Sequence, residues 1–216
     1  MPGFPSPFGS DDGGDLFDGY DEFVADDVPR PGEFLDGHDV LTGADHLAFH
    51  RITRDCFEER GVYDMTFDYN LARLNLDTRH GDAGFRYAVE RGDAADTVDG
   101  GEIEDDAADG ADRVLRAEFT PTTAFCPQTH TLTVGAFRAW NGLADRHEYD
   151  LVRVRAAPTH NQSEAVNDRL AELEEAYLGM GDAETAVDEG VGIGSNRVDK
   201  TGGASAPSGS TDAPFK

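Results

Sequence analysis

The sequence predicts an α+β fold, a small sheet of three to four strands covered by helices in the order α-β-β-α-β-α. Apolar residues recur at helical spacing in three stretches, and they alternate with polar residues in the stretches between. The regions that carry these patterns, 46–91 and 113–178, hold 17 acidic and 14 basic residues and are close to charge balance. A chain of 216 residues that is 38% hydrophobic suffices for one such domain, which we place at 46–178.

The domain begins with a predicted helix over residues 44–60. Gly61 ends the helical pattern, as glycine often does at the end of a helix. Alternating apolar residues then predict one or two short strands between residues 65 and 76. The apolar positions are Ala48, Phe49, Ile52, Cys56 and Phe57 in the helix, and Met65, Phe67, Tyr69, Leu71, Leu74 and Leu76 in the strands.

Two half-buried strands are predicted next, at 85–89 and 115–119, because apolar and charged residues alternate in both. We expect these strands to pair as an antiparallel hairpin. Their connection, 92–112, carries nine acidic residues and no basic one, which is typical of a solvated loop.

The C-terminal part of the domain predicts a helix, a strand and a second helix. Residues 149–155 alternate and form the predicted strand. The two helices follow from helical spacing of apolar residues: Leu132, Ala136, Trp140 and Leu143 in the first, and Val166, Leu170, Leu173 and Tyr177 in the second.

Both ends of the chain are predicted to be disordered. Residues 1–45 hold 12 acidic residues and one basic residue, too polar a stretch to offset the entropy of ordering. Their aromatic side chains offer an alternative, in which this segment docks on the domain or on a partner. Residues 179–216 are rich in Gly, Ser, Ala and Asp and predict a disordered tail.

The charge balance is strongly acidic, with 44 acidic and 18 basic residues and a net charge of −26. Of the acidic residues 29 are Asp, and Lys200 and Lys216 are the only lysines. Proteins of salt-loving microbes have similar compositions, so we interpret most of this charge as an adaptation to a salty environment. It also disfavours contact with nucleic acid, whose phosphates repel an acidic surface.

A cytoplasmic location is expected. No apolar run is long enough for a transmembrane helix, so no membrane contact is predicted. The first ten residues lack the basic and apolar regions of a secretory signal. Two cysteines, Cys56 and Cys126, cannot build a disulfide framework or a four-thiolate metal site.

Cys126 is the first candidate functional residue. Pro127 follows it, and proline favours the first position of a helix, so we expect Cys126 at or near the N-cap. Free N–H groups and the helix dipole at that position favour a thiolate. The alternative is a buried cysteine that acts as a small hydrophobic residue. For Cys56, on the apolar face of the first helix, this second interpretation is favoured.

Three threonines lead from the strand at 115–119 into Cys126. The hydroxyl groups of Thr120, Thr122 and Thr123 either line a polar pocket around the thiolate or satisfy the backbone of a turn.

His160 is the third candidate. It lies where the strand at 149–155 meets the last helix, so it is expected at the same end of the sheet as Cys126. Asn161 and Glu164 have a structural explanation as a capping box. One Cys and one His are too few for a metal site. They either form a Cys–His nucleophile or half of a site shared between subunits, or His160 is a surface residue.

These residues also carry a resemblance over positions 118–175. The chain resembles the family of small cytosolic iron–sulfur cluster assembly factors, which includes a subunit of the eukaryotic cluster-targeting complex and the bacterial proteins SufT and PaaD. The matching pieces are Phe119–Thr122, Cys126, Thr131 and Leu132, then Pro158–His160, Ser163, Glu164, Val166, Asn167 and Leu170.

The resemblance implies an accessory factor that matures iron–sulfur proteins, and not an enzyme. Cys126 would be its key residue, binding iron or a cluster transiently or contacting a client. Thr120, Thr122, His160, Glu164 and Asn167 would shape its surroundings. The partners implied are apo iron–sulfur proteins and other assembly factors. A homodimer is compatible with so few ligands, since a cluster could bridge two subunits. The rival interpretations are a Cys–His thiol enzyme and a non-catalytic interaction module.

Overall fold

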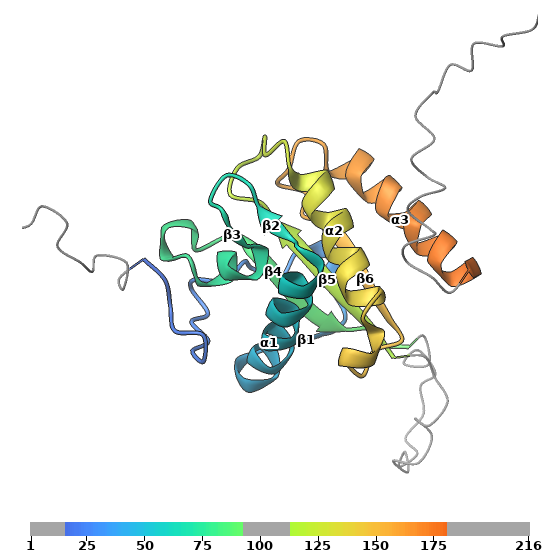
Figure 1. Cartoon of the computed structure of the whole chain (residues 1–216), viewed down its shortest axis with the longest axis horizontal. Helices are drawn as coiled ribbons and strands as arrows, with labels where there is room; N and C mark the ends of the chain where they lie inside the picture. The colour runs from blue at the N-terminus through green and yellow to red at the C-terminus, as the bar shows by residue number, and fades with distance from the viewer. Residues whose placement is uncertain (1–15, 93–112, 181–216) are drawn as a thin grey trace, which may run out of the picture.

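The computed structural model describes residues 16–92 and 113–180 as one α+β unit (Figure 1). Its centre is a four-stranded sheet in the order β1-β4-β5-β6. The predicted fold class is therefore confirmed. The strands are β1 (Asp39–Val40), β4 (Gly84–Val89), β5 (Val114–Thr120) and β6 (Leu151–Ala156).

Three helices surround the sheet, all at predicted positions. α1 (Gly43–Arg60) and α2 (Thr129–Asn141) lie side by side over one face, and α3 (Ser163–Met180) packs along β6 (Figure 1). Gly61 ends α1 in the left-handed conformation, with φ at 66°. Between helices and sheet the large fully buried side chains include Phe57, Phe85, Phe119, Phe137 and Trp140.

The strand pairing brings two loops to one end of the sheet. β4 and β5 are antiparallel, from Gly84 opposite Thr120 to Val89 opposite Leu115, which confirms the predicted hairpin. Its connection at 93–112 lies outside the described residues. β6 is parallel to β5, and α2 makes the crossover between them. The segments that follow β5 and β6 therefore leave the sheet at the same end.

The prediction for residues 65–76 is largely wrong. Only two-residue strands form, β2 (Tyr63–Asp64) and β3 (Tyr69–Asn70), and a 3₁₀ helix, η2 (Leu71–Leu76), replaces the second predicted strand. The carboxylate of Asp64 accepts the N–H groups of residues 66 and 67, which closes a turn, and Asn70 caps η2. The other 3₁₀ segments are η1 (Glu33–Leu35), η3 (Thr78–His80) and η5 (Ala144–Arg146).

Residues 16–41, which we name the N-terminal strap, are ordered against the sheet. The prediction of disorder over 1–45 is thus wrong for residues 16–45. Leu35 is fully buried, β1 extends the sheet beside β4, and Phe17 packs edge-on to Tyr69 with ring centroids 5.9 Å apart. Apolar anchors offset the ordering entropy that the acidic composition alone could not. The alternative of aromatic docking on the domain is confirmed for the strap; residues 1–15 and 181–216 lie outside the described part.

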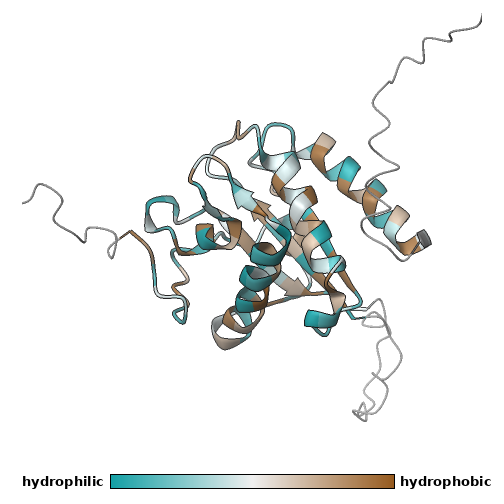
Figure 2. Cartoon of the chain, in the orientation of Figure 1, coloured by the Kyte–Doolittle hydropathy of each residue, from teal (hydrophilic) through white to brown (hydrophobic). Residues whose placement is uncertain are grey.

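The sheet has two chemically different faces. Phe85, Tyr87 and Leu115 are buried and point toward α1 and α2. The surface of α1 that faces the viewer in Figure 2 is mainly hydrophilic. The alternate residues point the other way, because side chains alternate across a strand. This charged face meets the strap and the side of α3; its members are Arg86, Glu90, Arg116, Glu118, Arg153 and Arg155, with Glu174 from α3.

Asparagine side chains satisfy the backbone of the edge strand β6 and of the part of β4 that β1 leaves uncovered. Asn75 bonds the N–H and C=O of Phe85 on β4, at 2.7 Å each. Asn141 does the same for Val152 on β6, at 2.9 Å each, and Asn167 for Ala156, at 2.7 and 3.0 Å. A side-chain amide presents the same donor and acceptor as a neighbouring strand, so the edges are satisfied without offering a template for another chain.

We expect Asn141→Ala to lower the free energy of unfolding by about 2–3 kcal/mol, since the buried N–H and C=O of Val152 would lose their partners. Urea denaturation measures this directly. Asn161→Ala is the matched control, because Asn161 is exposed and its side chain makes no hydrogen bond within the described residues. A change below about 0.5 kcal/mol in the Asn141 variant would contradict the proposed edge protection.

Candidate functional site

Three loops meet at the end of the sheet where β5 and β6 finish. We name residues 121–128 the cysteine loop. The N–H of Asn161 donates to the C=O of Ala124 at 2.9 Å, which joins this loop to the segment after β6. Gln128 joins it to the β2–β3 turn, accepting from the Met65 N–H at 3.1 Å and donating to the Thr66 hydroxyl at 2.8 Å. The loop is therefore held from both sides.

Cys126 lies near the middle of this loop as a free, half-buried thiol. Cys126 lies near the N-cap but not at it, since Gln128 is the N-cap and α2 begins at Thr129. Pro127 belongs to a turn before the helix, closed by the C=O of Cys126, which accepts from the N–H of Thr129 at 3.3 Å and from its hydroxyl at 3.1 Å. The free N–H groups at the start of α2 therefore do not account for a reactive thiolate at Cys126.

Cys56 contrasts with Cys126. It is 2% exposed within the core, as predicted, and burial raises the pKa of its thiol to about 11. Cys126 is consequently the less buried of the two cysteines.

His160 lies at the predicted end of the sheet but does not form a pair with the thiol. Its ring is buried, with Nε2 3.1 Å from the C=O of Cys126 and Nδ1 3.3 Å from the N–H of Gln162. A carbonyl only accepts, so Nε2 carries the proton and Nδ1 accepts. Both nitrogens are engaged with the backbone, and the Cys–His nucleophile interpretation loses its base. His160 positions the cysteine loop instead.

The three predicted threonines do converge. Thr120, Thr122 and Thr123 line a shallow pocket of about 370 Å³ with Thr159, opposite the turn at 79–83. Neither Cys126 nor His160 belongs to its lining. The threonines therefore line a recess at the start of the cysteine loop, and not a pocket around the thiol.

The two predicted site residues on α3 differ in the contacts that they make. Glu164 is exposed and makes no hydrogen bond within the described residues, because α3 begins at Ser163 and the Asn161–Glu164 capping box does not form. Asn167 protects the edge of β6 at Ala156, which gives it a structural role.

The sequence did not predict that two apolar side chains on the loops near Cys126 are exposed. Phe125 is 77% exposed on the cysteine loop, and Met65 is 80% exposed on the β2–β3 turn, which Gln128 ties to the loop. The sequence pattern predicted Met65 as an inward strand residue. In the sequence only Phe125 hints at this exposure, as an aromatic residue directly before the candidate cysteine. Exposed apolar groups on adjoining loops are typical of a surface that contacts another protein.

A second concavity lies at the opposite end of β5. It measures about 640 Å³, and its apolar wall comes from α1 and β4. Several of its polar groups are already partnered: Arg146 with Glu59, and His147 with the C=O of Trp140 and the N–H of Tyr149. The lining residues are Leu41, Asp45, Ala48, Phe49, Ile52, Val89, Arg113, Asp145, Arg146, His147, Glu148 and Tyr149. None of them is a predicted site residue.

Over residues 16–92 and 113–180, no three His, Cys, Asp or Glu side chains converge on a point where a metal could bind. The donors near Cys126 therefore do not fit a resident cluster. No helix in these same ranges combines the length and the hydropathy that a membrane crossing requires.

Fold and site together define a class: a small α+β domain that presents one half-buried thiol on a braced loop beside exposed apolar residues. The chain belongs to the family described as Domain of unknown function (DUF7998), whose match covers residues 15–184. This match includes the strap as well as the sheet. No curated protein and no solved structure matches the chain.

Proposed function

We propose that this protein is an accessory factor in the maturation of iron–sulfur proteins, which contacts its client through the cysteine loop. The observation that carries the proposal is the presentation of Cys126: a free thiol on a loop held by His160 and Gln128, with exposed Phe125 next to it. The resemblance of residues 118–175 to the assembly-factor family supports the same role.

The donor set supports a contacting role over a storage role. Cys126 has no converging ligands within the described ranges, so any iron or cluster that it touches is cargo whose other ligands come from the client or from a second copy. Phe125 supplies apolar area for recognition, because aromatic residues contribute strongly at interfaces.

The geometry disfavours the thiol-enzyme alternative. A nucleophilic cysteine needs a base within hydrogen-bond reach, and both nitrogens of His160 bind backbone groups. The remaining rival is an interaction module in which the thiol itself has no part.

The test replaces the chromosomal gene with Cys126→Ser, and with Cys56→Ser as the matched control, at equal protein levels. We expect the Cys126 variant to lose activity of aconitase, an iron–sulfur enzyme, while a cluster-free dehydrogenase keeps its activity. Cys56→Ser should spare both enzymes.

A third variant, Phe125→Ser, distinguishes a role that needs the thiol from a role as an interaction module. Loss of aconitase in both the Phe125 and Cys126 variants supports contact through the loop with a working thiol. Loss in the Phe125 variant alone would make the protein an interaction module. Normal aconitase activity in all variants would reject the proposed function. Covalent trapping of Cys126 by an electrophilic substrate analogue would then favour the hypothesis of a thiol enzyme.

A further inference from the structure

Arg86 is a buried cation without a counter-charge. It lies on β4, is 5% exposed, and its Nε and Nη1 atoms are fully removed from solvent. No group in the described residues accepts a hydrogen bond from its guanidinium. Burying a guanidinium is unfavourable unless an anion compensates it, and the pKa of Arg86 is lowered by this burial.

The other arginines of the charged face are all paired. Arg116 bonds Glu90 at 2.7 Å, Arg153 bonds Glu90 and Glu174, and Arg155 bonds Glu174 at 3.1 Å. Among the arginines of this face, Arg86 is therefore the one without an ion pair in the described residues.

The nearest carboxylate in register has another task. Glu118 lies directly opposite Arg86 across the β4–β5 pair, yet the two side chains form no ion pair. Oε1 of Glu118 instead accepts the N–H of Gly32 at 2.8 Å and holds the strap, and its Oε2 has no hydrogen bond within the described residues. The strap thus draws away the carboxylate that would have neutralised Arg86.

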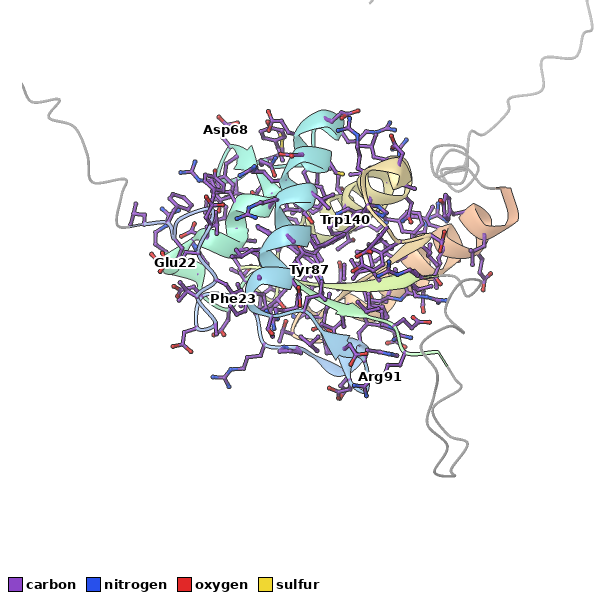
Figure 3. All side chains as sticks on the ribbon, turned by 90° about the horizontal axis from the view of Figure 1, so that it is seen from below. Glu22, Phe23, Asp68, Tyr87, Arg91 and Trp140 are labelled. Atoms are coloured by element: carbon purple, nitrogen blue, oxygen red, sulfur yellow. The ribbon has the colours of Figure 1, made fainter. Side chains whose placement is uncertain are left out.

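A second buried nitrogen without a hydrogen bond belongs to His46 on α1. His46 is 2% exposed and its Nδ1 is buried without a partner. Phe23 of the strap contacts both groups: its ring centroid is 5.0 Å from that of His46 and 5.6 Å from Cζ of Arg86. Tyr87 of β4 also contacts the ring of His46, with centroids 5.1 Å apart, and Figure 3 shows Phe23 and Tyr87 beside α1. Phe23 therefore packs against both side chains at the edge of β4, Arg86 from the charged face and His46 from α1.

We propose that Arg86 and His46 bind a small inorganic anion, of which chloride is the natural candidate, beneath Phe23. The near-complete burial of both side chains favours a monatomic ligand over a phosphate ester or an organic acid, which need an open path. A net charge of −26 repels anions, so the affinity is modest and the site fills at high chloride concentration. The bound anion fastens the strap to the edge of β4, independently of the proposed function.

The experiment measures the thermal unfolding of the full chain while potassium chloride replaces potassium glutamate at constant ionic strength. Constant ionic strength removes the general screening effect on an acidic protein. A ligand that binds only the folded state raises the Tm, and we expect a rise of about 4 °C as chloride increases from about 0.01 M to 1 M. Glutamate is too large for an enclosed site and serves as the reference anion.

Arg86→Met removes the binding group without removing the apolar stem. It should fold in glutamate as well as the parent protein, because it no longer buries an uncompensated charge, and its Tm should not respond to chloride. Arg169→Met, at an exposed ion pair with Glu172, should respond like the parent protein. Broadening of the ³⁵Cl resonance by the parent protein, absent with Arg86→Met, is a second readout.

A parent protein whose Tm is the same in chloride and glutamate would overturn the proposal without reference to any variant. An equal chloride response in the parent and in Arg86→Met would overturn it as well. Neither outcome bears on Cys126, so this proposal and the proposed function fail independently.

Discussion

Thr53→Val is expected to lower the free energy of unfolding by about 2–3 kcal/mol, although valine has nearly the same shape as threonine. Thr53 is fully buried on α1, and its hydroxyl oxygen accepts the indole N–H of Trp140 at 3.2 Å. Tyr87 Oη lies 3.3 Å from the same oxygen. Valine would leave the Trp140 N–H buried without an acceptor, which costs its full desolvation.

The cost is large because the hydroxyl belongs to a connected network. His50 donates from Nε2 to the C=O of Ala72 at 3.0 Å, so its Nδ1 accepts from the hydroxyl of Tyr87, also at 3.0 Å. Thr53 completes the set by donating to the C=O of Phe49 at 3.1 Å. Every bond in this network joins neutral groups inside an apolar core, where an unpaired member is most unfavourable.

Urea denaturation with Thr133→Val as the control isolates this effect. Thr133 is equally buried, but its hydroxyl bonds only backbone carbonyls of α2, at residues 129 and 130, so its loss strands no other side chain. The Thr53 variant should be clearly the less stable of the two. Equal stabilities would mean that the Thr53 hydroxyl contributes no more than a local helix bond.

The sequence did not predict this hydrogen-bond network, but it did predict the helices and strands around it. The periodicity of apolar residues located α1, α2, α3 and the strands β4, β5 and β6, because burying one face imposes that period on long elements. It failed at residues 65–76, where the side chains of Asp64 and Asn70 bond nearby N–H groups and override a two-residue alternation. Composition failed for the strap, because a few apolar anchors outweigh many solvated carboxylates.

The candidate site shows the same division. The parallel pairing of β5 and β6 brought Cys126 and His160 to one end of the sheet, as their places after the two strands had predicted. What the histidine does there depends on which atom it faces, and a shift of a few ångströms separates a thiol base from a brace for a carbonyl. No spacing rule resolves that difference. The exposure of Phe125 depends in the same way on the path of a short loop.

The second large effect is expected on acidification. Burial lowers the pKa of His50 to about 4, and burial, His50 and Arg86 lower the pKa of His46 to about 3. In the unfolded chain both would titrate near 6.5, so below that pH the unfolded state binds protons that the folded state refuses. Stability is therefore complete above pH 6.5 and is lost as the pH falls toward 4.

Between pH 7 and pH 5 we expect the free energy of unfolding to fall by about 3–4 kcal/mol, from roughly 1.4 kcal/mol per pH unit for each of the two buried histidines below 6.5, less the gradual onset of titration near that pH. Glu118 opposes this trend, because burial raises its pKa and its folded form takes up a proton more readily. On acidification its contribution enters as the pH falls through that raised pKa, and it is complete below the ordinary range of a carboxyl group.

Urea unfolding at the two pH values in molar potassium glutamate measures the loss while it screens the general repulsion among carboxylates and leaves the proposed chloride site empty. His46→Phe should remove about half of the pH dependence, since phenylalanine suits the contact with Phe23 and cannot be protonated. His130→Phe, at an exposed position on α2, should leave it intact. An unchanged free energy of unfolding between pH 7 and pH 5 would mean that the buried imidazoles accept protons in the folded state, and the neutral network around Thr53 would then have to rearrange around a charge.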